Sequence, residues 1–380
     1  MKIEQILINP LLEIQNIKTS TNFSADKANL VLSFGERETL ENFNLYDTVK
    51  TKYPNATVVI CSTAGQITNH NIIKNTIVTT AIEFEKSKIK IAKYNLLEQK
   101  DLSLLGKTIK DEITTDDLVA IMVLSEGTHV NGTELVEELS RATDSKIPIF
   151  GGIAGDSRNF QKTIVGINEN AKEGEIALIG FYGSHLKFGF GCEGGWTDYG
   201  PEREVTHSHK NVLYKIGDYY ALDLYKEYLG QYTNDLPGSA LYFPLSMKEN
   251  ENASPVVRTI LSINEEDKSM TFAGNIPQGA TVKLMKANFD KLIDASYTAA
   301  KATIKELNDN PQLVMAVSCV GREIVLDNRI EEEIEIMKDL YGKDAFLFGF
   351  YSYGEISPVV THKPCELHNQ TISITAMLEI

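Results

Sequence analysis

The hydrophobic positions along the chain form paired apolar runs that are separated by helical stretches. Three times, an apolar run of strand length is followed by a helical stretch and by a second apolar run that ends in small residues. The three units cover residues 29–65, 118–156 and 312–355. Continuous apolar runs are typical of strands buried on both faces, and a helix between two such strands indicates a β-α-β crossover. The sequence therefore predicts α/β layers near both ends of the chain.

Helical periodicity and stop signals recur between the strands. The pattern predicts helices near residues 39–53, 132–142, 218–229, 288–307 and 330–341. Pro54 and Asn55 stop the first of these helices, and Gly230 ends the third.

The middle of the chain has the pattern of antiparallel hairpins. Residues 163–214 and 240–285 are rich in Val, Ile, Phe, Tyr and Thr, and Gly, Asn-Glu and Pro turns interrupt them. The length of 380 residues exceeds the commonest domain size of about 100–150 residues, and a boundary near 211–217 gives similar halves. We therefore expect two related α/β domains, 1–210 and 211–380, with mixed sheets built from strand–helix–strand repeats plus antiparallel hairpins.

Acidic residues outnumber basic residues in this chain. The 52 Asp and Glu stand against 37 Lys and Arg, which gives a formal net charge of −15. A polyanion meets net repulsion from such a surface, so nucleic acid is not an expected partner. The chain has no run of about eighteen apolar residues, and residues 1–14 lack the basic region and apolar core of a signal peptide. We expect a cytoplasmic protein without direct membrane insertion.

The cysteines are Cys61, Cys192, Cys319 and Cys365, and no C-x-x-C pair occurs among them. The sequence therefore contains neither a zinc knuckle nor a dithiol redox motif, and free thiols in a reducing compartment are expected. Cys61 and Cys319 stand near strand ends, where a reactive thiol could act, but no flanking histidine activates either one. Packing cysteines are the expectation, and a cysteine-dependent enzyme is the alternative.

Two further motifs resemble binding sites for a dinucleotide and a metal, but neither is complete. The string from Gly189 to Gly194 spells G-x-G-x-x-G, but the residues up to Pro201 cannot begin the helix that would hold a pyrophosphate. His207 and His209 alternate in an expected strand and share a face, but no third metal ligand is placed by spacing. We predict neither a dinucleotide site nor a metal site.

Small residues with a polar group recur at the carboxyl ends of the predicted strands. Five of the six ends carry them, namely Ser62-Thr63-Ala64-Gly65, Glu126-Gly127, Gly155-Asp156, Gly321-Arg322 and Tyr353-Gly354-Glu355. Ligands bind α/β sheets at the carboxyl ends of the strands. Glycines at such ends also make ordinary turns, but their recurrence favours a small-molecule pocket that both halves share.

Motifs spread over most of the chain resemble the FIST family, which is named for F-box and intracellular signal transduction proteins and joins a FIST N-terminal and a FIST C-terminal domain. The motifs are VVICSTAGQI at 58–67, GGIAGD at 151–156, ALDLYKEYLG at 221–230, FAGNIPQG at 272–279, SCVGR at 318–322, GFYSYGEI at 349–356 and HNQT at 368–371. The sequence departs from the family at Tyr220, where a proline more often precedes the alanine.

The resemblance implies a sensory module, not an enzyme, that recognises a small molecule such as an amino acid. Such modules are associated with histidine kinases, chemoreceptors or cyclic-dinucleotide enzymes, and we expect the signal to leave through a separate protein. Relatives that resemble haem-based nitric oxide sensors imply an alternative with an axial histidine, for which His209 and His368 are the candidates. No histidine is placed by spacing as a ligand, so no cofactor is expected.

Residue types assign provisional roles in the expected pocket. Arg322 would pair with a ligand carboxylate, while Asp156 or Glu355 would receive an ammonium group. Both Arg322 and Glu355 are then expected to be reachable by solvent when no ligand is bound. The complete predicted ligand site consists of Ser62, Thr63, Gly65, Gly155, Asp156, Arg322, Tyr353, Glu355 and Asn369.

Overall fold

The computed structural model describes residues 1–69, 71–359 and 364–380, and in it each predicted β-α-β unit forms a parallel strand pair. The pairs are β3 (Leu30–Gly35) with β4 (Thr57–Ser62), β9 (Leu118–Ser125) with β10 (Ile149–Ile153), and β23 (Leu313–Cys319) with β24 (Phe346–Ser352). The predicted α/β class with mixed sheets is confirmed.

The crossover helices lie at the predicted positions, except that one of them is divided into two. The second unit contains α5 (Gly132–Ala142), and the third contains α8 (Val320–Leu326) and α9 (Glu331–Tyr341). In the first unit, the expected helix at 39–53 is divided into α1 (Arg37–Glu41) and α2 (Leu45–Lys52). Asn44 adopts φ −81° and ψ 70°, which is outside the helical region, so a single helix cannot pass through it.

Within the described residues, the strands form three sheets of six strands and one sheet of nine. The first sheet has the order β11 (Val165–Ile167), β4, β3, β7 (Ile77–Glu83), β1 (Lys2–Ile8), β2 (Ile14–Thr19). The second has the order β26 (Cys365–His368), β25 (Gly354–Pro358), β10, β9, β12 (Glu175–Tyr182), β8 (Lys88–Asn95). The third has the order β13 (Leu186–Glu193), β27 (Ile372–Glu379), β23, β24, β5 (Gln66–Ile67), β6 (Ile72–Ile73).

Strands from the two halves of the sequence share two of these sheets. In the second sheet, β25 from the C-terminal half pairs with β10. In the third sheet, β5 and β13 from the N-terminal half pair with β24 and β27. The hairpin pattern expected over residues 163–214 does not hold between β12 and β13, because β8 and β9 occupy both edges of β12 and β13 continues into another sheet.

The inner faces of the three sheets meet in one core. Phe34 of the first sheet lies 4.8 Å from Phe350 of the third, measured between ring centroids. Phe150 of the second sheet lies 5.9 Å from Phe190 of the third. All four rings are fully buried, so the three sheets stabilise one another through a shared apolar interior.

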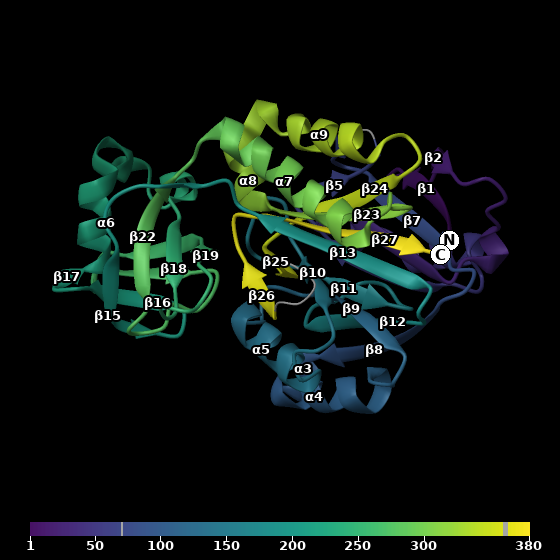
Figure 1. The fold of residues 1–380 in the computed structure, drawn as a ribbon, viewed down its shortest axis with the longest axis horizontal. Coiled ribbons are helices and arrows are strands. Elements are labelled where there is room, and N and C mark those ends of the chain that lie inside the picture. Colours follow the sequence, from purple (N-terminus) through teal and green to yellow (C-terminus); the bar gives the residue numbers. More distant parts are fainter. Residues whose placement is uncertain (70, 360–363) are drawn as a thin grey trace.

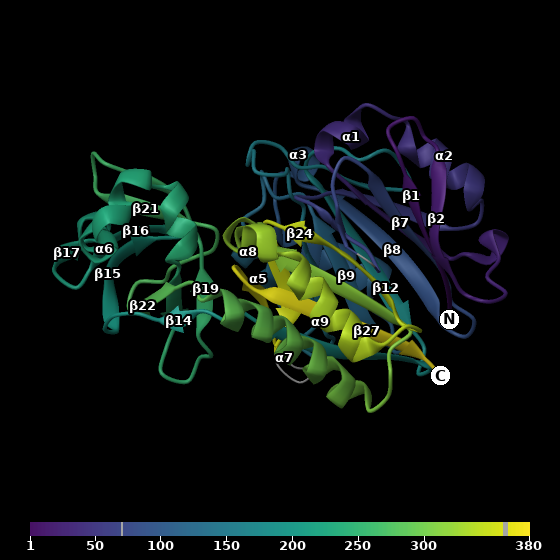
Figure 2. The same cartoon turned by 90° about the horizontal axis from the view of Figure 1, so that it is seen from above.

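A smaller lobe projects from one end of this body, far from both termini (Figures 1 and 2). Its sheet has the order β19 (Val256–Arg258), β18 (Leu245–Lys248), β22 (Thr281–Lys286), β15 (Arg203–His209), β16 (Val212–Ile216), β21 (Ser269–Phe272), β20 (Ile260–Asn264), with β14 (Thr197–Asp198) beside β22 and β17 (Tyr219–Tyr220) beside β16. Together with α6 (Ala221–Leu229), these strands enclose a separate apolar core that includes Leu222 and Phe272. The predicted division at residue 210 falls inside this lobe.

The long helix α7 (Phe289–Leu307) leads back from the lobe and covers the third sheet (Figure 2). Its backbone lies directly against β13, where a Cβ atom at Gly189 would stand 2.3 Å from the carbonyl oxygen of Thr303. At Gly191 the corresponding distance to the Ala299 oxygen would be 2.1 Å. The glycines of the G-x-G-x-x-G string therefore serve close packing of a helix on a strand.

Candidate functional site

A cleft of about 730 Å³ lies between the small lobe and the body. Its volume is within the range of about 300–1,000 Å³ that is typical of small-molecule sites. The body contributes residues 127–132 and 319–321 together with Ile153, Phe160 and Tyr353. The lobe contributes residues 259–261 and 272–273 together with Asn211, Pro237, Gly238 and Leu241.

The body side of the cleft is made by the carboxyl ends of two parallel strand pairs. Residues that follow β9, β23 and β24 line it, and Ile153 is the last residue of β10. The end of the third pair is adjacent, because Gly155 N donates to Ser62 O at 2.9 Å and Ala64 N donates to Tyr351 O at 2.8 Å. All three crossover units therefore deliver their strand ends to one region, which is where ligands bind α/β sheets.

Direct contacts attach the lobe to the body on either side of the cleft. On one side, Asn131 Nδ2 donates to Asn275 Oδ1 at 3.1 Å, and Arg258 Nη1 donates to Leu367 O at 3.0 Å. On the other side, Gln370 Nε2 donates to Leu241 O at 3.3 Å. The Arg258 guanidinium is buried, and burial lowers its pKa to about 10.

The loop after β9 is held by a buried carboxylate. Glu126 accepts hydrogen bonds from His129 N at 3.1 Å, from Thr163 Oγ1 at 2.7 Å and from the backbone N of Thr128. The ring atom Nδ1 of His129 lies 3.2 Å from the same carboxylate, which accepts its proton. Because Nδ1 is engaged in this way, Nε2 is the ring nitrogen that a ligand in the cleft would meet.

Two aromatic rings form part of the body wall. Phe160 and Tyr353 stack with their centroids 4.6 Å apart and their planes at 15°. The hydroxyl of Tyr353 accepts a hydrogen bond from Phe160 N at 3.0 Å, which fixes the two rings together. Burial is the largest cause that raises the pKa of Tyr353 to about 12.

A second hollow, of about 500 Å³, lies beside Lys2, Asp26 and Glu83. It includes Ala28 and Asn29, which precede β3, so it stands at the amino ends of the strands. Its walls are mainly polar and open to solvent, which makes the interlobe cleft the better candidate for ligand binding.

Five of the predicted site residues meet at the junction of β4 and β10, namely Ser62, Thr63, Gly65, Gly155 and Asp156. Ser62 Oγ accepts a hydrogen bond from Ile164 N at 2.9 Å, and Thr63 Oγ1 donates to Gly35 O at 3.3 Å. A Cβ atom at Gly155 would stand 2.8 Å from Ala64 N, so the close backbone approach there is to the chain itself. The carbonyl of Gly65 accepts a hydrogen bond from Tyr351 N at 2.9 Å. These groups join two strand ends, and their role toward a ligand stays a prediction.

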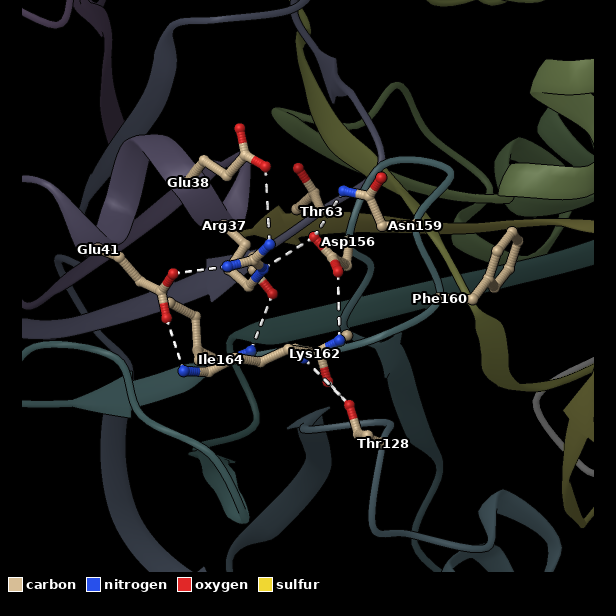
Figure 3. A network of polar contacts seen from close by, with 12 residues as sticks. Arg37, Glu38, Glu41, Thr63, Thr128, Asp156, Asn159, Phe160, Lys162 and Ile164 are labelled. Carbon is tan, nitrogen blue, oxygen red and sulfur yellow. Dashed lines mark hydrogen bonds and ion pairs between the residues drawn. The ribbon is translucent and has the colours of Figure 1, made fainter.

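Asp156 is the centre of a network of charges (Figure 3). Its Oδ1 accepts from Arg37 Nε at 2.9 Å, and its Oδ2 accepts from Lys162 N at 3.2 Å. Glu41 binds Arg37 at 2.7 Å and the Lys162 ammonium at 2.8 Å. Phe160 belongs to the same loop but lies apart from these charges in the figure. Asp156 is therefore already neutralised by a cation of the chain.

Arg322 does not have the solvent exposure that the sequence suggested, because its side chain is completely buried in α8. Arg322 Nε donates to Glu333 Oε1 at 2.9 Å, and Nη2 approaches the same oxygen. Its Nη1 donates to Gly194 O at 2.6 Å, and Nη2 also donates to Leu292 O at 2.7 Å. The expectation of an exposed Arg322 is wrong because the carboxylate of Glu333 on α9 holds it in the core.

Glu355 is also completely buried, so the expectation of its exposure is wrong too. Its Oε1 accepts from Ser352 Oγ at 2.7 Å, and its Oε2 accepts from the hydroxyl and the N–H of Thr371 at 2.7 and 3.1 Å. Burial raises the pKa of Glu355 to about 8, although these hydrogen bonds and Arg322 act in the opposite direction. Glu355 lies beneath the cleft and not on its wall.

Of the nine predicted site residues, Tyr353 lines the cleft. Asn369 is buried, and its Oδ1 has no hydrogen-bond partner among the described residues. Sequence reasoning missed His129, Phe160 and Thr259. The strand-end pair Glu126-Gly127 pointed to the correct loop for His129, but no sequence signal distinguishes Thr259, which lies between β19 and β20, from any other threonine of the chain.

The structure gives little support to a metal or haem ligand at the candidate histidines. Over 1–69, 71–359 and 364–380, no group of three or more His, Cys, Asp or Glu is arranged to hold a metal ion. His209 is exposed on β15. His368 is buried, and its Nε2 donates to Ser357 O at 3.0 Å, so an iron atom there would have to displace this bond. Burial lowers the pKa of His368 to about 4.

The cysteines are free and buried. Burial raises the pKa of the Cys61 and Cys319 thiols, which disfavours the thiolate that a nucleophile needs. Cys319 nevertheless lines the cleft. In the part of the chain that the structure covers, none of the helices combines the length and the apolar character needed to span a bilayer.

Comparisons with known proteins place this geometry in a family. A solved structure of cyanuric acid hydrolase from A. caulinodans is similar at 8% identity and a TM-score of 0.37, covering 93% of this chain and 91% of that chain. An uncharacterized protein of Methanocaldococcus jannaschii is 24% identical over 376 residues, which cover 91% of this chain and 70% of that protein. The FIST N domain matches residues 29–218 and the FIST C domain matches residues 221–358. The chain therefore belongs to the FIST family.

Proposed function

We propose that the chain is a sensor that takes up a small molecule in the interlobe cleft and passes its occupancy to a separate signalling protein. FIST domains are sensory and signal-transduction domains, which supports the general role. The observation that carries the proposal is the cleft of about 730 Å³ at the convergent strand ends. A ligand there would contact the body and the lobe at once.

The attachment of the lobe supports a route for the signal. Polar contacts of Asn131, Arg258 and Gln370 fix the lobe on both sides of the cleft. A ligand that contacts both walls binds one lobe orientation better than others, and so shifts the population toward it. A partner such as a histidine kinase, a chemoreceptor or a cyclic-dinucleotide enzyme would then recognise that orientation.

The ligand we propose differs from the amino acid that the family resemblance implied. Arg322 and Glu355 lie beneath the wall of the cleft, and Asp156 is paired with Arg37. The cation and the anion that a free amino acid requires are thus occupied by partners within the chain. This favours a ligand that does not depend on them.

Thermal unfolding in the presence of a metabolite library tests the proposal. Gly238 lines the cleft, and a Cβ atom there would meet nothing within 4 Å, so Gly238→Trp fills the cleft without disturbing the backbone. Lys305→Trp on the exposed face of α7 is the matched control. A ligand of the cleft raises the melting temperature of the wild type and of Lys305→Trp, but not of Gly238→Trp. Equal stabilisation of all three proteins would place the binding elsewhere.

We propose further that Cys319 is not a nucleophile, although it lines the cleft. Its burial and raised thiol pKa support this view. Iodoacetamide at neutral pH should alkylate Cys319 more slowly than a free thiol in a model peptide, as mass spectrometry of the digested protein can show. Alkylation faster than that of the peptide would favour the cysteine-dependent enzyme instead.

A further inference from the structure

The walls of the cleft carry little charge for so acidic a protein. Among the residues that the structure describes, no Asp, Glu, Lys or Arg lines the cleft. Glu126, which precedes the lining residue Gly127, is itself buried and accepts hydrogen bonds from Thr128 N and His129 N of the loop. A ligand with a full charge would lose its hydration on entering and find no Asp, Glu, Lys or Arg opposite it, and the ring of His129 is already engaged with Glu126 through Nδ1, so its entry is costly. The cleft is therefore suited to an uncharged ligand.

A buried hydroxyl on the lobe wall lacks a partner. Thr259 is 6% exposed and lines the cleft. Its carbonyl oxygen accepts from Ala273 N at 2.9 Å, but its Oγ1 has no hydrogen-bond partner within the described part of the chain. Buried hydroxyls in folded proteins nearly always have a partner. Because this oxygen is shielded from solvent, a ligand group in the cleft can supply the missing partner once the Thr259 side chain rotates to turn its hydroxyl toward the cleft.

On the body side of the cleft, a comparable unpaired polar atom lies behind a glycine of the wall. Gly321 lines the cleft, and a Cβ atom there would stand 2.4 Å from Gln370 Oε1. This amide oxygen is also without a partner among the residues described, while the amide nitrogen holds Leu241 of the lobe. An unsatisfied polar atom thus also lies behind the body wall, where Gly321 separates it from the cleft.

The stacked rings supply the apolar surface for such a ligand. Phe160 is 48% exposed although it lines the cleft, and Tyr353 holds it in a fixed orientation. Phe272 faces the cleft from the lobe. A flat ring can stack on the exposed part of Phe160, because aromatic rings in contact prefer offset-stacked or edge-to-face arrangements.

We propose that the cleft selects an uncharged planar ring compound whose hydrogen-bonding substituent meets Thr259 Oγ1 while its ring packs against Phe160. This inference rests on the proposed function, since it names the class of ligand for the same cleft. Its two halves are separable, because Thr259 recognises the polar group and Phe160 recognises the ring.

A series of isosteric probes tests the inference. 2-Naphthamide is neutral, 2-naphthoate is an anion and 2-naphthamidine is a cation of nearly the same shape, so titration calorimetry with the wild type isolates charge. The amide should bind at least tenfold more tightly than either ion. Thr259→Val removes the hydroxyl at constant volume and should weaken the amide about fivefold to tenfold, while it leaves unsubstituted naphthalene unchanged. Phe160→Ala should weaken all the ring compounds.

Control variants keep the outcome interpretable. Thr298→Val on the exposed face of α7 should leave every affinity unchanged, and thermal melts confirm that each variant is folded. The inference is overturned if an ion binds as tightly as the amide, if Thr259→Val does not affect the amide, or if none of the probes binds. If a charged metabolite stabilises the wild type but not Gly238→Trp, the proposed function stands and only this inference fails. If Gly238→Trp binds the amide as the wild type does, both fail.

Discussion

Arg322 and Glu333 form a charge pair in a place that water does not reach. Both side chains are 0% exposed, and the guanidinium also bonds two backbone carbonyls. Arg322→Ala would leave the Glu333 carboxylate buried and unpaired, and should lower the free energy of unfolding by about 3–5 kcal/mol. Arg141→Ala, which breaks the exposed pair with Glu138, should lower it by less than about 1 kcal/mol. Urea denaturation of both variants distinguishes these effects, and equal small losses would mean that the Arg322 pair is not buried in solution.

The Glu355 carboxyl should make stability depend on pH. Its pKa rises from 4.5 to about 8 on folding, so the folded protein holds this proton more tightly than the unfolded chain does. From pH 4.5 to about 8, folding requires a proton that the unfolded chain has lost, so this group lowers stability as pH rises through that window. Each pKa unit corresponds to about 1.4 kcal/mol.

Glu355→Gln keeps the hydrogen-bonding shape and removes the titration. Its free energy of unfolding, measured by urea denaturation, should fall less between pH 5 and pH 9 than that of the wild type, and the variant should be the more stable protein at pH 9. Parallel curves for the two proteins would show that the carboxyl ionises without cost.

Single residues were the hardest part to predict from the sequence. Arg322 and Glu355 stand at strand ends, as ligand-binding residues do, but polar residues at such positions also fill cores. What decided between these roles was Glu333 on α9, which meets Arg322 on α8 because both helices pack against α7. Thr259 carries no local signal, since the lack of a partner is a property of its surroundings. Tyr353 is the predicted site residue that lines the cleft, and its role toward a ligand stays a prediction.

At the scale of elements, the contact between β13 and α7 depends on glycine. Gly191→Ala would place a Cβ atom 2.1 Å from the Ala299 oxygen, so the helix must move away. We expect a loss of about 1–3 kcal/mol in the free energy of unfolding, together with a lower melting temperature. In Gly106→Ala, on α4 (Ser103–Thr108), the nearest neighbour of the new Cβ would be Glu138 Oε2 of α5 at 3.7 Å, so stability should be unchanged or slightly higher. Equal effects in the two variants would contradict the close packing.

The periodic elements were predictable because their signals are local. Continuous apolar runs gave the three parallel pairs, and Gly132–Ala142 matches the helix expected there. The pairing partners of the strands were not predictable in this way, because they come from distant parts of the sequence. The turn between β12 and β13 looks like that of a hairpin, but the two strands join different sheets because β8 and β9 already occupy β12. Distant segments decide which strand edges remain open.

For the whole molecule, the shared sheets predict that neither half folds alone. Residues 1–210 would lack β25, which pairs with β10, and β24, which pairs with β5. The fragment should therefore show no cooperative thermal transition and should bind a dye for exposed apolar surface. Co-expression with residues 211–380 supplies the missing strands and is expected to restore the transition. A sharp melt of the 1–210 fragment alone would refute this interdependence.

The lobe enters and leaves the body through two strands that lie side by side, since Thr197 of β14 pairs with Lys286 of β22. Such an arrangement is that of a cassette inserted at a single point of a continuous framework, as in tolerated domain insertions. The framework and the cassette can then vary at different rates. The framework contains the core that the three sheets share, and the cassette contributes one wall of the cleft. Exchanging the segment between these paired strands with that of a relative offers a route to altered ligand choice with an unchanged framework.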